Sequence, residues 1–401
     1  HSFPTRRSSD LILIDQVRST GVRTPIVHGC DATRRQVPFA WQALERIAAP
    51  DLNHWFKQGV LDDFGVLLNE HGTRFFDAEF LLGIEPRKDG RLGKVRGSER
   101  NPFTAGVICA KVARYAERAE NLSRLLRNTI TRITQIEDNA DNADIAKLLC
   151  MVTHVTGEYP GFVGDDSAEL IQHPETELSR LIYDAQVSGS VRQNVLSMIR
   201  ASRNLRDNLS DDMRRVISQL EIAPHASQMF SAQYAHLFDV VIYLSSIAGL
   251  SQENMSREVG WHFLELGRRI ERAAFSVRVL KSYVMQGNIY DKFIVENLLN
   301  INDIRITYTR RYRHRIEADS VLDILLFDES NPRSLGYQLA RIRDFVPVLP
   351  AKTEGVRPPA EKLALRLYTT YRVADIREIF SAEDAAKRME NWLNEIDLYL
   401  G

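Results

Sequence analysis

The sequence has few cysteines, no excess of charge of either sign and no apolar run long enough to cross a membrane. Its three cysteines, Cys30, Cys109 and Cys150, form no Cys-x-x-Cys pair, which excludes a disulfide framework and favours a reducing compartment. The formal net charge is -1, so no overall field attracts nucleic acid or anionic lipid. The longest apolar run, Leu237 to Leu250, contains Asp239 and is shorter than the about 20 residues that a bilayer requires. These absences predict a cytoplasmic protein without a membrane span, in which any anion site is a local cluster.

Motifs of self-sufficient catalysis are also missing. No glycine-rich phosphate loop, Gly-x-Ser-x-Gly elbow or Cys/His nucleophile pair stands out, which argues against a hydrolase or an ATP-binding enzyme acting alone. We therefore expect no cofactor. Glu258, His262 and Glu265 are spaced to share one helical face and could hold a metal ion, but no second set of ligands accompanies them, so no metal site is predicted.

Three regions of the chain differ in character. Residues 1–11, HSFPTRRSSDL, resemble a sequencing adapter translated in one frame and are left out of the fold prediction. Residues 12–98 contain strand-like runs and a hairpin signal at Asn69 to Gly72, which predict a small α+β segment of unassigned role. The stretch Glu85 to Pro102 is rich in glycine, proline and charge and is predicted to be an exposed linker. Residues 99–401 are predicted to form a helical domain.

Beyond residue 103, apolar residues recur at helical spacing, and glycine and proline lie mainly between the segments. The pattern predicts a mainly α, multi-helix bundle. Asn331-Pro332 is expected to begin one helix, because Asn accepts bonds from free N–H groups and proline loses none at the first turn. The expected helices cover 104–135, 143–157, 175–221 with breaks, 227–249, 255–286, 290–315, 318–327, 332–346, 360–380 and 383–399.

An Arg-x-x-Glu-Arg motif occurs twice in this bundle. The stretch Ala113 to Ala119 is echoed by Gly267 to Ala273, and the two copies are 154 residues apart. The three charges of each copy lie on one helical face. Apolar residues surround the second copy on all sides, including Trp261 and Phe275, so we predict that its charges are buried. Since buried charges need partners, the two helices are predicted to be neighbours that satisfy each other.

Arginines outnumber glutamates in these motifs and on one similar face near residue 203. The surplus could be met by carbonyl groups, by acids elsewhere, or by an anionic ligand held by guanidinium groups. We predict that six arginines line one cavity for a carboxylate or phosphate, and that three residues of nearby motifs complete the ligand-binding set. The arginines are Arg114, Arg118, Arg203, Arg206, Arg268 and Arg272, and the others are Asn121, Trp261 and Arg333.

Two other interpretations of the charged motifs stay open. The chain could be an enzyme in which Glu117 or Glu271 acts as acid and base beside the arginines. It could also be a scaffold whose charges only fix helix register. A water-accessible Glu/Arg cleft would favour binding or catalysis, and a sealed network would favour the scaffold. The basic run Arg310 to Arg315 could bind nucleic acid, but the neutral total charge favours a solvated helix face.

Read together, these segments resemble the alpha-E family over residues 103–398. The stretch Arg114 to Asn121 (RYAERAEN) matches the first hallmark, Met255 to Ala273 matches the long central motif, and Asn331 to Ser334 a later one. The chain departs from the usual pattern at Ala110-Lys111, Arg200-Ala201, Arg214 and His262, which indicates a divergent member.

The resemblance implies a genomic context rather than a reaction. Members are encoded with, or fused to, a circularly permuted ATP-grasp ligase, often near a transglutaminase-like protein and a proteasome-like peptidase. We therefore expect a helical accessory or substrate-binding subunit of a system for peptide or amide bonds. From charge and composition we expect no membrane partner, and we do not expect nucleic acid.

Overall fold

The computed structural model describes residues 84–86, 92–94, 102–135, 142–164, 167–222, 224–313, 315–349, 357–375 and 384–400. The chain divides into two compact units, His1–Val107 and Ile108–Gly401, which are treated separately.

A short hairpin is described in the first unit. Strand β1 (Ile84–Pro86) pairs antiparallel with β2 (Leu92–Lys94), and Ile84 lies opposite Lys94. Most of this hairpin lies in the stretch Glu85 to Pro102, which the sequence predicts to be an exposed linker. The strands and hairpin predicted between residues 12 and 83 lie outside the described residues.

The rest of the described chain is helical, which confirms the mainly α prediction. The elements are α5 (Pro102–Gln135), α6 (Asn142–Thr156), η2 (Gly161–Val163), α7 (Ser167–Gln172), α8 (Glu175–Tyr183), α9 (Val191–Ser202), η3 (Arg203–Asn208), α10 (Asp211–Glu221), α11 (Phe230–Asn254), α12 (Val259–Met285), α13 (Lys292–Ile301), α14 (Arg305–Tyr312), α15 (Ala318–Leu326), α16 (Leu335–Phe345), η4 (Val346–Val348), α17 (Pro359–Arg372) and α19 (Ala385–Leu400).

Two predicted boundaries are wrong for local reasons. The helix expected over 290–315 is divided into α13 and α14, because Asp303 adopts a left-handed conformation (φ 56°) that ends the first helix. The helix expected to begin at Asn331-Pro332 begins instead at Leu335. Its N-cap is Ser334, whose side chain accepts a hydrogen bond from the Tyr337 backbone N–H.

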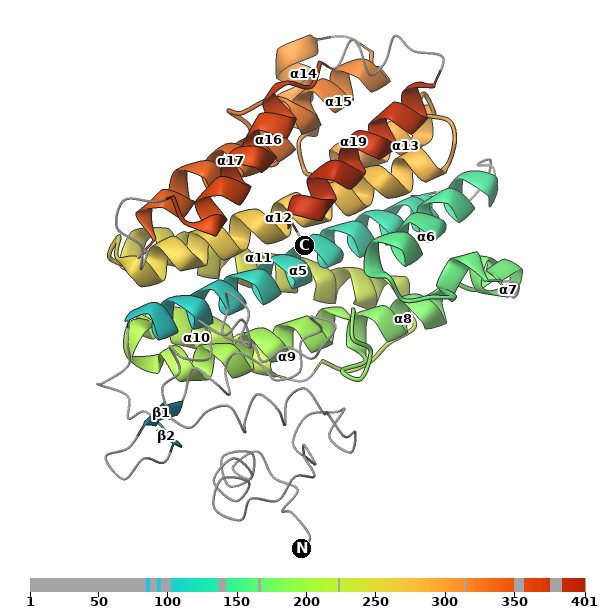
Figure 1. The fold of residues 1–401 in the computed structure, drawn as a ribbon. Helices are drawn as coiled ribbons and strands as arrows, with labels where there is room; N and C mark the ends of the chain where they lie inside the picture. Colours follow the sequence, from blue (N-terminus) through green and yellow to red (C-terminus); the bar gives the residue numbers. More distant parts are fainter. Residues whose placement is uncertain are drawn as a thin grey trace, which may run out of the picture. The chain divides into compact units, whose positions relative to one another are not determined.

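Helices α5 and α12 lie side by side through the middle of the helical unit (Figure 1). Helix α12 contacts α16, α19 and α6, and α17 packs on α16 and α19. On the other side of α5, α8, α9, α10 and α11 pack on one another in pairs. Because α12 is covered from several directions, most of its residues are buried, as its apolar residues on all sides predict.

Helix α11 is, among the described helices, the one long and apolar enough to span a membrane by length and composition. It contains the apolar run Leu237 to Leu250 that the sequence analysis judged too short for a bilayer. Its buried residues recur at helical spacing from Leu237 to Ser251 and pack against α8 and α10, whereas Tyr234, Phe238 and Ile242 are exposed. Length and composition alone do not place this helix in a membrane.

Candidate functional site

The two copies of the Arg-x-x-Glu-Arg motif face each other from α5 and α12. The backbones approach closely near the start of the motifs, because Gly267 has no side chain to separate them. A Cβ atom at Gly267 would lie 2.6 Å from the carbonyl oxygen of Ala110. This close approach brings the charged side chains of each helix within reach of the other.

The arginines of each motif pair with the central glutamate of the other motif. Arg272 donates from Nε and Nη2 to the two carboxylate oxygens of Glu117, at 2.9 and 2.6 Å, and Arg268 Nε lies 3.5 Å from the same carboxylate. In return, Arg114 and Arg118 approach Glu271, at 3.2 and 2.8 Å. Equivalent positions of the two repeats therefore have equivalent roles, which confirms that the helices are neighbours and complete each other.

Both central glutamates are sealed from solvent. Glu117 is 2% exposed and Glu271 1%, and Arg268 and Arg272 are also buried, which confirms the prediction of buried charges in α12. Burial alone would raise the pKa of Glu271, but the charges and hydrogen bonds of Arg118, together with Arg114 and Arg278, hold that pKa below its usual value. Glu271 is consequently an ionised carboxylate at neutral pH.

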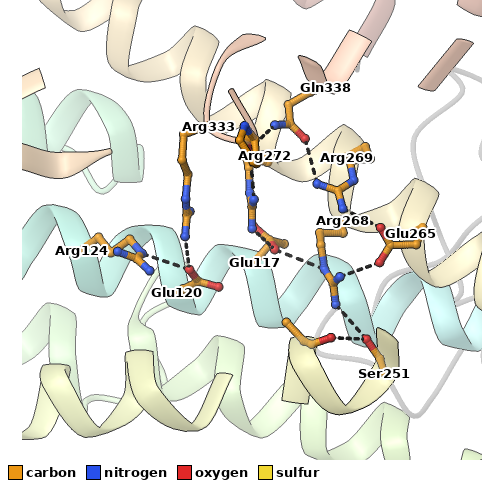
Figure 2. Close-up of polar contacts among 12 residues, drawn as sticks. Glu117, Glu120, Arg124, Ser251, Glu265, Arg268, Arg269, Arg272, Arg333 and Gln338 are labelled. Atoms are coloured by element: carbon orange, nitrogen blue, oxygen red, sulfur yellow. Dashed lines mark hydrogen bonds and ion pairs between the residues drawn. The ribbon is translucent and has the colours of Figure 1, made fainter. Parts of the chain in front are cut away.

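Two further carboxylates, which the sequence analysis did not place in the network, join it (Figure 2). Glu265 accepts hydrogen bonds from Arg268 and Arg269, both at 2.5 Å, and from Gln252 at 2.6 Å. The spacing of Glu265 three and four residues before these arginines could have indicated the pairing. Acids elsewhere therefore meet part of the expected surplus of arginines, but each of these acids pairs with two arginines, so arginines still outnumber glutamates in the network.

Glu120 is the second of these carboxylates. Glu120 accepts hydrogen bonds from Arg124 at 2.9 Å and from Arg333 at 2.8 Å. Arg333, one of the predicted ligand-binding residues, is therefore part of the network. Burial opposes ionisation, but the charges of Arg333, Arg272 and Arg124 lower the pKa of Glu120 to about 2. The network thus runs along α5 and ties the loop before α16 to the central pair.

The six arginines do not line one cavity. Arg203 is half-exposed and pairs with Glu221 on α10, away from the central helix pair. The side chain of Arg206 lies outside the described residues. Arg203 continues α9 in a helical conformation and keeps the face that the periodicity assigns to it, together with Ile199, but that face lies beside α10 and not beside the α5–α12 pair.

Asn121 and Trp261, two of the predicted ligand-binding residues, each keep one buried side-chain nitrogen without a hydrogen-bond partner among the described residues. Asn121 is buried in α5, and its Nδ2 atom has no hydrogen-bond partner among the described residues. Trp261 stacks under the Arg257 guanidinium, 4.4 Å from the ring centroid, and meets Phe345 edge to face. Its Nε1 atom is likewise buried without a partner in the described part of the chain.

A small cavity borders the network between α5, α10, α11 and α12. Its volume of about 20 Å³ suits roughly one water molecule. Glu117, Glu120 and Arg268 supply its charged lining, and the rest is mostly apolar. Cys109 also lines it, but burial raises the pKa of this thiol to about 12, so it is not a nucleophile at neutral pH.

The residues of the other constellations considered from sequence have partners of their own. Glu265 is held by arginines instead of facing His262, and no group of metal-ligating side chains suited to an ion occurs in the described residues. In the basic run, Arg311 pairs with Asp328 at 2.7 Å and Tyr312 donates to Asp323 at 2.5 Å. These bonds tie α14 to α15 and the turn that follows it.

The comparison with known families rests on this helical region. A family model described as an alpha-helical domain with a conserved ER motif matches residues 112–400. The chain belongs to the Alpha-E family. Within the matched range the Glu-Arg dipeptide occurs twice, as Glu117-Arg118 and Glu271-Arg272, which are the residues that the two central helices exchange.

Curated relatives of this Alpha-E chain are mycobacterial. Uncharacterised proteins of Mycobacterium bovis and of one strain of Mycobacterium tuberculosis are each 29% identical over 227 residues, and one from a second M. tuberculosis strain is 28% identical. Each match covers 53% of this chain but 25% of the relative, so the match spans a quarter of the length of these proteins. No solved structure matches the chain.

Proposed function

We propose that this Alpha-E protein is a helical accessory or substrate-binding subunit of an ATP-grasp peptide or amide ligase system. The observation that carries the proposal is the reciprocal exchange between α5 and α12, in which each candidate acid/base glutamate is buried and clamped by arginines. A general acid or base must release and regain a proton within reach of substrate. Glu271, with its lowered pKa and 1% exposure, is poorly suited to that role, which argues against catalysis. The sealed carboxylates alone would favour a scaffold, and the half-exposed arginines at the edge of the network favour binding.

An anionic ligand would bind at the outer edge of the network. Around Glu271 the side chains of Arg118 and Arg278 are 39% and 37% exposed, while the side chain of Glu271 is 1% exposed. Three arginines, with Arg114 as the third, share this one buried anion and leave positive charge toward solvent, because guanidinium cannot lose its proton. A carboxylate or phosphate of a substrate would be attracted to this edge.

The length of the relatives supports a partner protein. In each mycobacterial relative the match accounts for a quarter of the chain, so the region occurs joined to a much longer sequence. A domain that is fused to others in some proteins commonly works beside them when it is separate. Identifying that partner as a circularly permuted ATP-grasp ligase rests on the family resemblance, and a transglutaminase-like protein is a further candidate on the same basis.

The test has a partner assay and a ligand assay. Amide-bond formation by the ATP-grasp ligase encoded beside this gene should rise when the chain is added, and the chain alone should form no product. Separately, triglutamate should raise the melting temperature of the wild type but not of Arg118→Ala. At a ligand concentration ~100 times Kd the stabilisation would be ~2.7 kcal/mol.

Arg132→Ala is the matched control, since Arg132 is also on α5 and faces one acid, Glu296, at 3.8 Å. This variant should keep the ligand response. Product formed by the isolated chain, and abolished in Glu117→Gln or Glu271→Gln, would establish the enzyme instead. No effect on the ligase and no response to any anion would leave a structural scaffold.

A further inference from the structure

Helix α11 carries an exposed stripe on the side opposite its buried residues. The stripe consists of Ser231, Ala235, Phe238, Ile242, Ser245 and Gly249, each of which is exposed. These positions are alternately four and three residues apart, and a mean period of about 3.5 residues is that of the contact seam between two paired helices. The buried residues of α11 lie on its other side and pack against α8 and α10. The stripe is therefore a second face, separate from the one that packs into the bundle.

This outward face is apolar where a solvated helix would carry charge. Phe238 is 44% exposed and Ile242 47%, and the adjacent Tyr234 is 40% exposed. Helix α11 contains no lysine or arginine, and its acidic residues are Asp239 and Glu253. The outward face of a surface helix is ordinarily charged or polar. A contiguous apolar patch that is left exposed marks an interaction surface.

The stripe is complementary in shape to a second copy of itself. Its large residues, Phe238 and Ile242, are followed by the small residues Ser245 and Gly249. A Cβ atom added at Gly249 would meet no atom within 4 Å, so the surface there is open. When two copies of α11 run antiparallel, with Ile242 on the two-fold axis, the large half of each stripe faces the small half of the other. Phe238 then enters the space above Ser245 and Gly249 of the other copy, as a knob enters a hole.

The charges of the helix favour the same arrangement. Asp239 is three residues before Ile242 and Ser245 is three residues after it, so an antiparallel pair brings each Asp239 carboxylate to a hydroxyl of the other copy that can donate to it. A parallel pair would place two Asp239 carboxylates side by side, where like charges repel. An anionic lipid surface is a poorer occupant, because helices that lie on such membranes carry Lys and Arg, and α11 has neither. Arg127 of α5 borders the stripe, and its guanidinium lies over the Phe238 ring, 5.8 Å from the centroid.

We propose that α11 is the interface through which two copies of this chain associate as an antiparallel, two-fold dimer. A helix of 25 residues is about 37 Å long, and a contact about 10 Å wide along it covers roughly 370 Å² of each copy. Because a standard stable interface covers about 800 Å² per partner, the dimer is a weak one with a micromolar dissociation constant. The interface goes beyond the proposed function, since it requires neither the ligase partner nor the Glu271 edge.

The test is analytical ultracentrifugation of the full chain from about 1 to about 300 µM, a range that brackets micromolar dissociation constants. The average mass of the wild type should rise from that of one chain toward twice that value. Ile242→Glu and Ile242→Lys should each stay monomeric, because a residue on the two-fold axis meets its own copy and like charges repel. An equal mixture of the two variants should associate again, since glutamate then faces lysine.

Recovery in the mixture also shows that both variants fold, so their loss of association is not a loss of structure. Leu363→Glu is the matched control, because Leu363 on α17 is 43% exposed and lies outside the stripe, and this variant should associate like the wild type. Gly249→Leu should prevent association without lowering the melting temperature, since the added side chain fills the space that Phe238 of the other copy requires.

A wild type that stays monomeric over the whole range would overturn the proposal and leave the stripe to another segment or to a partner protein. Association of Ile242→Glu equal to that of the wild type would overturn it as well. Cosedimentation of the monomer with phosphatidylglycerol vesicles, lost in Ile242→Glu, would assign the stripe to a lipid surface instead. Arg118→Ala should dimerise normally, which separates a failure of this interface from a failure of the proposed function.

Discussion

At the scale of residues, the buried charges of this protein are organised as shared clusters instead of isolated pairs. Glu117, Glu265 and Glu271 each approach at least two arginines, from their own helix or from another. Such a cluster offsets the cost of removing charge from water only when every member keeps its partners. Loss of one carboxylate should consequently be far more damaging than loss of an exposed one.

Glu271→Ala tests this expectation most directly. It leaves Arg114, Arg118 and Arg278 without their shared anion and should lower the free energy of unfolding by about 3–5 kcal/mol, the range for breaking a buried ion pair. Urea unfolding measures the loss. The exposed Glu253 on α11 is the control, and Glu253→Ala should change stability by less than about 0.5 kcal/mol. Equal effects of the two variants would contradict the account of the network.

The lowered pKa of Glu120 predicts how the stability of the folded chain depends on pH. Its pKa is lowered to about 2 in the folded chain, so the folded state binds this proton less readily than the unfolded chain does. The stabilisation is therefore complete above the unfolded value near ~4.3 and is lost as the pH falls toward the folded pKa. The difference in unfolding free energy between wild type and Glu120→Gln should shrink between about pH 4.5 and pH 2. A difference that stays constant over that range would show that the arginines do not lower the pKa of Glu120.

At the scale of elements, the network depends on how closely α5 and α12 approach. A glycine in the middle of a helix is unfavourable, and Gly267 is tolerated because a Cβ there would contact the backbone of Ala110 at 2.6 to 3.1 Å. The glycine thus sets the spacing at which Arg272 can bind both oxygens of Glu117.

Gly267→Ala should therefore force the two helices apart. The expected cost is about 1–3 kcal/mol from overpacking, despite the better helix propensity of alanine. Gly249→Ala is the matched change, because Gly249 also lies inside a helix but has nothing within 4 Å of the added Cβ. It should stabilise the chain by roughly 0.4–1 kcal/mol. Thermal melting of the two variants should shift in opposite directions, and a neutral Gly267→Ala would show that the spacing is not critical.

At the scale of the whole molecule, the family match and the bundle cover the same residues. The Alpha-E region begins inside α5 and extends through α19. Helix α12, which is joined to α5 by the buried network, packs against α16 and α19, and Lys281 on α12 pairs with Asp397 on α19. This region should fold as one cooperative unit.

Limited trypsin digestion tests that unit. Arg96 and Arg100 lie between β2 and α5, so cleavage there should release a helical fragment that is stable to further digestion. Residues 102–401 expressed alone should melt at the same temperature as the full chain. Resistance of the segment to trypsin, or unfolding of the isolated fragment, would show that the boundary lies elsewhere.

The periodicity of apolar residues and the repeat determined much of this structure in advance. Helical spacing identified most described helices, because burial of one face imposes a period of about 3.6 residues on any sequence that folds this way. The matched positions of Arg114 and Arg268 also indicated that α5 and α12 exchange partners. Both inferences concern residues that are near in sequence or repeated, where local geometry is enough.

Beyond the two repeats, tertiary structure alone decided which charged side chains lie next to each other. Arg333 reaches Glu120 and Arg203 pairs with Glu221, and such distances depend on how loops and 3-10 turns place whole helices. The acids that meet part of the arginine surplus were hidden for the same reason, since Glu120 and Glu265 belong to faces whose partners are set by packing. Spacing along the chain fixes the face of a side chain, but only the packed helices fix what lies opposite that face.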